Sequence, residues 1–293
     1  QDVYAVGNIA NTEAILWKNG EAEILSSNGN RAKALDVFVT NTDVYVVGTI
    51  KDATTNKEKA VLWENGVPTE LTDGTNNAEA SAIYVANNTT YVVGYEASSN
   101  SSPIAMLWKN GIGETISSSG SSARDVFVSG ENVYIAGHKT IGSITPTVWT
   151  NGTGASFSGT GTLYTVEVLE DIVFTAGSLF SPNRAAVWQG GTKTELPDSR
   201  TALDIAFLEN NTYIVGYSSF NAPMLWQNGD AINLNSSFTD GVVFSVKTFG
   251  ENVYIGGYKV SQGKRIALIL KNDEEIILSD GSESTIVSSL FIK

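Results

Sequence analysis

The chain has 293 residues, no cysteine and a formal net charge of −13. The lack of cysteine excludes disulfides and thiolate metal sites. The acidic balance argues against nucleic acids and anionic membrane surfaces as partners, because binding either one requires clustered lysine and arginine.

No apolar run approaches the length of a transmembrane helix, so we expect no membrane insertion of this domain. The sequence begins at Gln1 and not at a methionine. We therefore expect that a targeting segment was removed, or that the chain was cut from a longer protein. We expect the protein to be extracellular or to lie on an outer surface.

A repeated pattern runs along the whole chain. It first occurs at Val3 to Gly20, where VYAVG is followed by AILWKNG, and it returns from Asp36 to Gly66. Later copies begin at Tyr91, Val133, Val173, Tyr213 and Val253. One copy per roughly 40 residues is typical of a repeat architecture.

Each copy contains four short apolar segments separated by turn residues. In the second copy we expect strands at Ala34–Thr40, Val44–Gly48, Ala60–Glu64 and Thr69–Leu71, which we name strands A to D. Asn65-Gly66 is a strong hairpin signal between strands C and D. No segment has a 3.6-residue apolar period, so helices should be nearly absent.

Two residue types recur at fixed places. A glycine closes strand B in every copy and indicates a bulge or a close backbone approach; these are Gly7, Gly48, Gly94, Gly137, Gly177, Gly216 and Gly257. Strand C carries all six tryptophans, Trp17, Trp63, Trp108, Trp149, Trp188 and Trp226, with Leu270 in the seventh copy. A residue present once per copy at a fixed place indicates packing between repeats.

The two ends of the chain are complementary. The sequence opens on a strand B, Val3 to Gly7, and finishes on a strand A, Ile286 to Lys293. Pairing of these two segments would complete one sheet and remove the open edge of a linear array. The sequence therefore predicts one all-β domain over residues 1–293, a seven-bladed β-propeller of four-stranded antiparallel blades. A linear solenoid is the alternative, but it would need polar capping repeats.

The repeat pattern also resembles a known group of proteins. The series D-V-[FY]-V-x(4)-V-Y-[VI]-[VA]-G, [AP]-x-[LV]-W-x-N-G and E-x-L-x-D-G is similar to the propeller-repeat proteins that Bacteroidetes-type bacteria secrete or anchor to lipid. Asp36 to Gly74 fits best, and Leu270 to Asp273 departs most. The resemblance covers the whole chain. It implies a signal peptide, a lipidated cysteine and a polar spacer, but it names no catalytic residues.

Three carboxylates share one repeat position at the start of strand A: Asp36, Asp125 and Asp204. Since strand A should be innermost, we expect them near one mouth of the central channel. They could form a weak cation site with carbonyls and water. We favour the alternative, in which each one accepts hydrogen bonds that hold a neighbouring blade. His138 is the only histidine, so we expect no histidine metal site, and no motif calls for a cofactor.

The loops between strands B and C, and those between strand D and the next strand A, vary in length, and both should lie on one face, the variable-loop face. Four residues directly follow a strand-B glycine and could ring this face: Tyr95, His138, Tyr217 and Tyr258. Exposed aromatic side chains there would favour glycan binding by stacking. Packing beneath the loops is the other interpretation.

We therefore expect a monomeric, non-enzymatic binding module that holds a glycan, peptide or protein on the variable-loop face. Two alternatives remain. One is a carboxylate-dependent glycoside hydrolase or lyase with its site at the channel mouth, and the other is a structural spacer in a larger surface protein.

Overall fold

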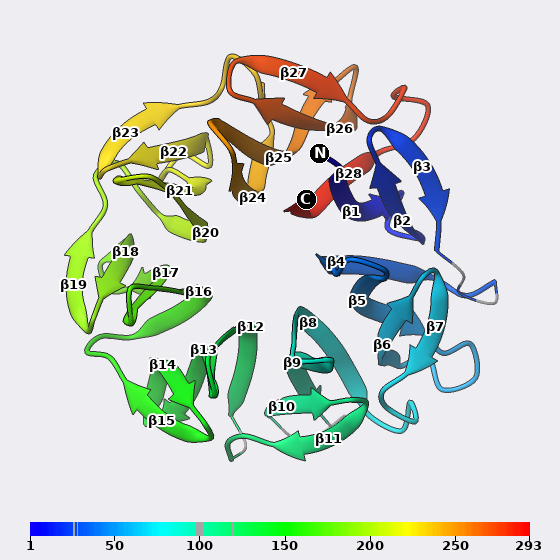
Figure 1. Cartoon of the computed structure of the whole chain (residues 1–293), viewed down its shortest axis with the longest axis vertical. Helices are drawn as coiled ribbons and strands as arrows, with labels where there is room; N and C mark the ends of the chain where they lie inside the picture. The colour runs from blue at the N-terminus through cyan, green and yellow to red at the C-terminus, as the bar shows by residue number, and fades with distance from the viewer. Residues whose placement is uncertain (26, 28, 98–101, 119) are drawn as a thin grey trace.

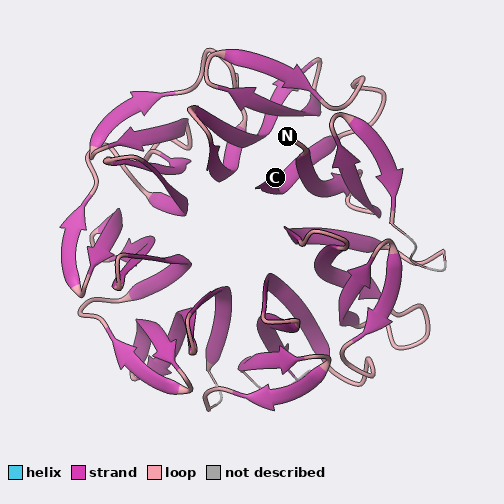
Figure 2. Ribbon diagram, in the orientation of Figure 1, coloured by secondary structure: helices cyan, strands magenta, loops and turns pink. Residues whose placement is uncertain are grey.

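Seven four-stranded antiparallel sheets surround a central axis (Figure 1). The computed structural model describes residues 1–25, 27, 29–97, 102–118 and 120–293. Every regular element in these ranges is a strand (Figure 2). Within the same ranges no helix is long and apolar enough to span a membrane. The prediction of a seven-bladed β-propeller is confirmed.

The strands occupy four concentric positions. The innermost strands are β4 (Ala32–Val39), β8 (Asn77–Ala86), β12 (Ser121–Ser129), β16 (Gly161–Leu169), β20 (Thr201–Leu208), β24 (Val242–Phe249) and β28 (Thr285–Ile292). The second strands are β1 (Val3–Ile9), β5 (Val44–Lys51), β9 (Thr89–Ala97), β13 (Asn132–Ile141), β17 (Ile172–Phe180), β21 (Asn211–Tyr217) and β25 (Asn252–Ser261).

The outer half of each blade completes the sheet. The third strands are β2 (Glu13–Lys18), β6 (Glu58–Glu64), β10 (Ile104–Lys109), β14 (Ser143–Thr150), β18 (Asn183–Gln189), β22 (Pro223–Gln227) and β26 (Lys264–Lys271). The outermost strands are β3 (Glu21–Ile24), β7 (Val67–Glu70), β11 (Ile112–Thr115), β15 (Thr153–Ser156), β19 (Thr192–Glu195), β23 (Asp230–Asn233) and β27 (Glu274–Ile277).

The two ends of the chain share one sheet, as the sequence predicts. The C-terminal strand β28 pairs with β1 over a register that includes Tyr4 opposite Phe291 and Ala5 opposite Leu290. The N–H of Asp2 donates to the carbonyl of Lys293 at 2.7 Å, and the N–H of Lys293 donates back at 2.9 Å. The ring of blades is therefore closed by backbone hydrogen bonds between the first and last strands.

The second strands are longer than the sequence suggests. In the second blade β5 continues past Gly48 to Lys51, since Ile50 pairs with Lys59 on one side and with Ala32 on the other. The repeated glycine therefore lies inside the strand and does not end it. Backbone pairing continues into segments whose polar sequence suggested loops.

Each of these glycines faces a bulge in the innermost strand. In the second blade Gly48 pairs with Ala34 and the next pair is Asp36 with Val47, so Leu35 is skipped. A Cβ atom on Gly48 would lie 1.9 Å from the Lys33 carbonyl oxygen, and the equivalent distance at the other six glycines is between 1.8 and 2.1 Å. Only glycine allows this approach, which confirms the predicted bulge.

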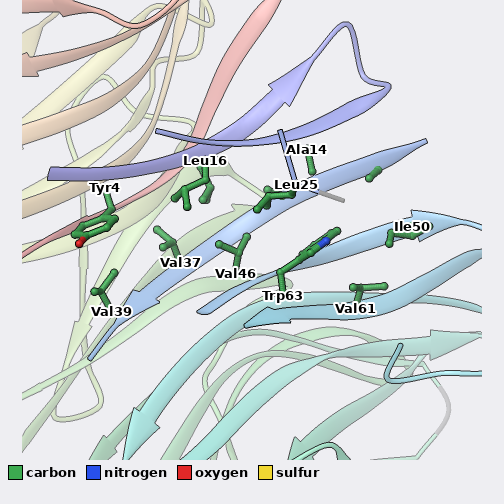
Figure 3. Close-up of a cluster of buried hydrophobic side chains, with 13 residues drawn as sticks. Tyr4, Ala14, Leu16, Leu25, Val37, Val39, Val46, Ile50, Val61 and Trp63 are labelled. Atoms are coloured by element: carbon green, nitrogen blue, oxygen red, sulfur yellow. The ribbon is translucent and has the colours of Figure 1, made fainter. Parts of the chain in front are cut away.

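The tryptophans form the core between blades. All six are at most 2% exposed. Trp63 of the second blade packs with Leu16 and Leu25 of the first (Figure 3). Six of the seven blade interfaces are built in this way, because each tryptophan clusters with buried residues of the preceding blade. Between the sixth and seventh blades Leu270 belongs to the equivalent cluster.

Replacement of Gly48 tests the bulge. We expect Gly48→Ala to lower the free energy of unfolding by about 2–4 kcal/mol, because the new methyl group collides with backbone and not with a flexible side chain. Gly20→Ala is the matched control: Gly20 has a φ of +86° but no atom within 4 Å of an added Cβ. Its cost should be about 1 kcal/mol, from backbone conformation alone. Equal losses in chemical denaturation would contradict the proposed contact.

Candidate functional site

The inner strands enclose a cavity of about 390 Å³ on the propeller axis. Each bulge places two consecutive residues on the channel wall, whereas a regular strand would alternate. Three layers of equivalent positions result. The inner strands run from the variable-loop face towards the A–B hairpin turns, so we call the layers loop-side, middle and turn-side in that order.

The loop-side layer consists of the residues skipped at the bulges: Leu35, Ser81, Arg124, Tyr164, Leu203, Phe244 and Ser288. The middle layer follows directly: Asp36, Ala82, Asp125, Thr165, Asp204, Ser245 and Ser289. The turn-side layer lies two residues further on: Phe38, Tyr84, Phe127, Glu167, Ala206, Lys247 and Phe291, of which all but Ala206 line the cavity.

The three predicted carboxylates lie in the middle layer, on alternate blades. Asp36 accepts a hydrogen bond from the N–H of Ile83 at 2.9 Å and one from the Ser289 hydroxyl at 2.6 Å. It therefore connects the second blade to the blades on both sides. Asp125 accepts the N–H of Val166 in the next blade at 2.7 Å.

Asp204 makes the most contacts of the three. It accepts the N–H of Val246 and the hydroxyl of Ser245, each at 2.9 Å, and forms a salt bridge with Lys247 at 3.0 Å. An innermost strand is a sheet edge, so its outward N–H groups need partners from elsewhere. The carboxylates supply those partners across the blade boundaries, as in the interpretation we favoured from the sequence.

The channel raises the pKa of several acids. Burial, together with the charges of Asp36 and Asp204, raises the pKa of Asp125 to about 7. Burial also raises the pKa of Asp36 above its usual range. The pKa of Lys247 lies above its ordinary value although burial opposes this, because the carboxylates of Asp204 and Glu167 outweigh the cost of burial. In the described ranges, no group of three or more aspartate, glutamate or histidine side chains could hold a metal ion.

Four adjacent blades contribute aromatic rings to the turn-side layer. The ring centroids of Phe291 and Phe38 are 4.9 Å apart, those of Phe38 and Tyr84 4.9 Å, and those of Tyr84 and Phe127 5.0 Å. We call these four residues the aromatic arc. All four are half-buried and line the cavity while packing into the interfaces between blades.

Glu167 is the turn-side-layer residue of the fifth blade, which follows Phe127 of the fourth blade around the ring. It forms no hydrogen bond and no salt bridge with any other residue that the structure describes, although its side chain lines the cavity. Burial raises the pKa of Glu167 to about 8; Lys247 opposes this rise, and Asp125 and Asp204 add to it. The charge of Glu167 also helps burial to raise the pKa of the Tyr84 phenol, so the two groups influence each other within the channel.

Sequence reasoning did not identify Glu167, Lys247 or the aromatic arc. The sequence signal for them is the repeat position two residues after the one that Asp36 occupies. Aligned by copy from the first blade, that position reads Phe291, Phe38, Tyr84, Phe127, Glu167, Ala206 and Lys247.

The four residues predicted to ring the loop face lie on strands and not in loops. Tyr95, His138, Tyr217 and Tyr258 belong to β9, β13, β21 and β25, and all four are half-buried. They share this position because the second strands extend beyond the glycines. None of them lines the cavity. A ligand-binding role for these residues stays a prediction.

Two of these four have defined partners. His138 Nδ1 lies 3.3 Å from the Thr162 hydroxyl of the next blade, and burial lowers the pKa of the imidazole to about 4, so it is neutral at neutral pH. The Tyr258 ring lies 6.1 Å from that of Phe244, and the Arg265 guanidinium sits over it at 5.1 Å. Both residues fit the alternative of packing beneath the loop face.

Comparisons with known proteins agree on the fold. No model of a protein family matches the chain, and no curated protein sequence does. A solved puromycin-hydrolyzing peptidase from Mycobacterium tuberculosis matches 94% of the chain and 53% of its own length, with a TM-score of 0.59 and 9% identity. An acylaminoacyl peptidase from Pyrococcus horikoshii matches 95% of the chain and 50% of its own length, with a TM-score of 0.55 and 11% identity.

The chain thus spans about half the length of these two peptidases. The β-propeller domain of the Trilobed protease from Pyrococcus furiosus matches 96% of the chain and 94% of its own length, with a TM-score of 0.54 and 11% identity. That domain is described as having an open velcro topology. Here, by contrast, β28 and β1 close the ring.

Glu167 should make stability depend on pH. With a pKa of about 8 in the folded chain, compared with an ordinary value of 4.5, it keeps a proton that the unfolded chain loses. Folding therefore takes up a proton between these pH values, and its contribution to stability falls as pH rises through this window.

We expect Glu167→Gln to raise the free energy of unfolding at about pH 8 by on the order of 1–2 kcal/mol, the full linkage value being reduced by solvent in the channel. The substitution should have little effect near about pH 4.5. The control is Glu170→Gln, which removes an exposed acid from the same hairpin. Thermal melts in which the two variants respond alike to pH would contradict the assignment.

Proposed function

We propose that this propeller is a binding module whose ligand occupies the central channel. One observation carries the proposal: an arc of four aromatic rings lies next to Glu167, a carboxyl that has no partner among the described residues. Ligand sites typically combine apolar and aromatic walls with a few polar groups that fix orientation, in cavities of roughly 300–1,000 Å³. The cavity of about 390 Å³ lies within that range.

The state of the three middle-layer carboxylates favours binding over turnover. Each of their six oxygens accepts at least one hydrogen bond from a backbone N–H or a hydroxyl. A carboxylate that acts as general base or nucleophile must direct a free lone pair at the substrate. These three are already engaged in joining the blades, so they are poor candidates for the hydrolase or lyase that the sequence left open.

The ligand site proposed here is the channel, whereas the sequence led us to expect the variable-loop face. Peptide and glycan ligands both fit an aromatic wall, and their route in would cross the variable-loop face or the turn face. An extracellular location and a monomeric state remain part of the proposal.

A second candidate is a propeller domain that serves a peptidase. The likeness to two peptidases of about twice the matched length favours it, although at 9–11% identity that likeness concerns the fold alone. In that case the channel would still bind a peptide, and hydrolysis would depend on residues beyond this sequence.

The test is a binding screen with two matched variants. The chain is probed with a glycan array and a peptide library of neutral, acidic and basic members. We expect saturable binding that Tyr84→Leu weakens about tenfold or more, because the loss of an aromatic anchor costs about 1–3 kcal/mol. Tyr217→Leu removes a half-buried tyrosine outside the cavity and should leave affinity unchanged.

The opposite pattern, in which only Tyr217→Leu weakens binding, would place the site on the loop face. If nothing binds in either library, the spacer interpretation is favoured. Hydrolysis of a library member by the isolated chain would show that binding is only part of its activity.

A further inference from the structure

The strongest unexplained feature is the charge balance of the channel. Among the residues that the structure describes, four acids line the cavity, Asp36, Asp125, Asp204 and Glu167. Two cations, Arg124 and Lys247, line it as well. Lys247 forms its salt bridge with Asp204 at 3.0 Å. Arg124 forms a salt bridge with Glu79, which does not line the cavity; its Nη1 lies 3.5 Å from Glu79 Oε1.

Both cations on the wall are thus engaged, and Glu167 is left without one. Glu167 is half-buried, and a carboxyl that is partly removed from water and left unpaired is costly. Protonation or a cation relieves the cost. The neighbouring groups do not relieve it: Asp125 and Asp204 add negative charge, and Lys247 acts on Glu167 only from beyond salt-bridge distance.

Phe127, at one end of the aromatic arc, holds the equivalent position in the preceding blade, and the charge of Glu167 acts on Tyr84 of the arc. The faces of aromatic rings attract cations, and a planar guanidinium can stack on them. The arc also offers an apolar surface to an alkyl chain. A negative group next to several ring faces is complementary to a positive head on an apolar stem.

We infer that the channel takes an organic cation that bears N–H donors, a primary ammonium or guanidinium group, with its head at Glu167 and its stem against the aromatic arc. The inference rests on the proposed function and names the ligand class. The N–H donors follow from Glu167, whose free oxygens need hydrogen-bond donors that a quaternary ammonium lacks. The cavity of about 390 Å³ has room for a side chain of lysine or arginine length.

Other occupants fit less well. An anion would meet four acids, and a metal ion would find no suitable ligand group within the described ranges. A neutral sugar could stack on the rings but would give the Glu167 carboxyl no charged partner. The net charge of −13 would also attract a cation from solution.

Binding should release a proton. Since the pKa of Glu167 in the empty channel is about 8, the carboxyl is mostly protonated at neutral pH, and a cation would favour its ionised form. Asp125, with a pKa of about 7, could release a further fraction. Affinity should therefore rise with pH up to about 8 and then level off.

The experiment is isothermal titration with N-acetyl-arginine N-methylamide, and with the citrulline analogue as a neutral control of the same shape. We expect the arginine compound to bind at least about tenfold more tightly, and its affinity to rise by up to about tenfold per unit between about pH 6 and about pH 8. n-Butylamine and a short peptide with one internal arginine distinguish a free amine from a peptide side chain as the natural source.

Two variants locate the effect. Glu167→Gln should reduce the affinity to that of the citrulline compound and remove most of the pH dependence, whereas Glu170→Gln, with the same loss of charge on the surface, should change neither. Thermal melts establish that both variants are folded.

Three results would overturn the inference: equal binding of the arginine and citrulline compounds, unchanged binding by Glu167→Gln, or no binding of any cation at millimolar concentration. If a neutral glycan or peptide binds instead and Tyr84→Leu weakens it, the cation inference fails while the proposed function stands. If no ligand of any kind depends on Tyr84, both fail.

Discussion

The close approach of a glycine to a backbone carbonyl is the contact on which the architecture depends. It occurs in all seven blades, and in each one a Cβ atom would lie within about 2 Å of the carbonyl oxygen. The contact allows a bulge in the innermost strand, and the bulge puts two consecutive side chains on the channel wall. The loop-side and middle layers of the channel both follow from it.

The innermost strands also have backbone N–H groups that lack a partner within their own sheet, and carboxylates accept hydrogen bonds from three of them. Inner strands are sheet edges, and in three blades a free N–H group points to the preceding blade. Asp36, Asp125 and Asp204 accept those groups from alternate blades. Burial raises the pKa of Glu167, and the charges of two of these acids, Asp125 and Asp204, raise it further. The aspartates of the middle layer therefore both join neighbouring blades and favour a cation in the channel.

The fold could be predicted because each repeat carries its own packing residues. The tryptophan of strand C and the glycine of strand B recur at constant spacing, and the incomplete copies at Val3 and Lys293 indicate how the ring closes. Strand ends were less predictable. Thr49 and Ile50 look like the start of a loop, yet they pair with strands on both sides.

The channel site could be predicted only in part. The position of Asp36 near the axis follows from the order of strands. Glu167 is one of three departures, with Ala206 and Lys247, at a position that is aromatic in the other four copies. The alternation of a regular strand does not show where such a residue points once a bulge intervenes. Its significance depends on the spatial neighbours Tyr84 and Lys247, which are far away in sequence.

The most direct test of this account is the pKa of Glu167 itself. Carbon-13 NMR of protein labelled at the glutamate carboxyl groups, with the Glu167→Gln spectrum for assignment, follows its titration in the ligand-free chain. The account predicts a midpoint of about 8, displaced downwards when an arginine compound is added. A midpoint near the ordinary value of 4.5, unchanged by that compound, would contradict the claim that the channel holds an unpaired acid awaiting a cation.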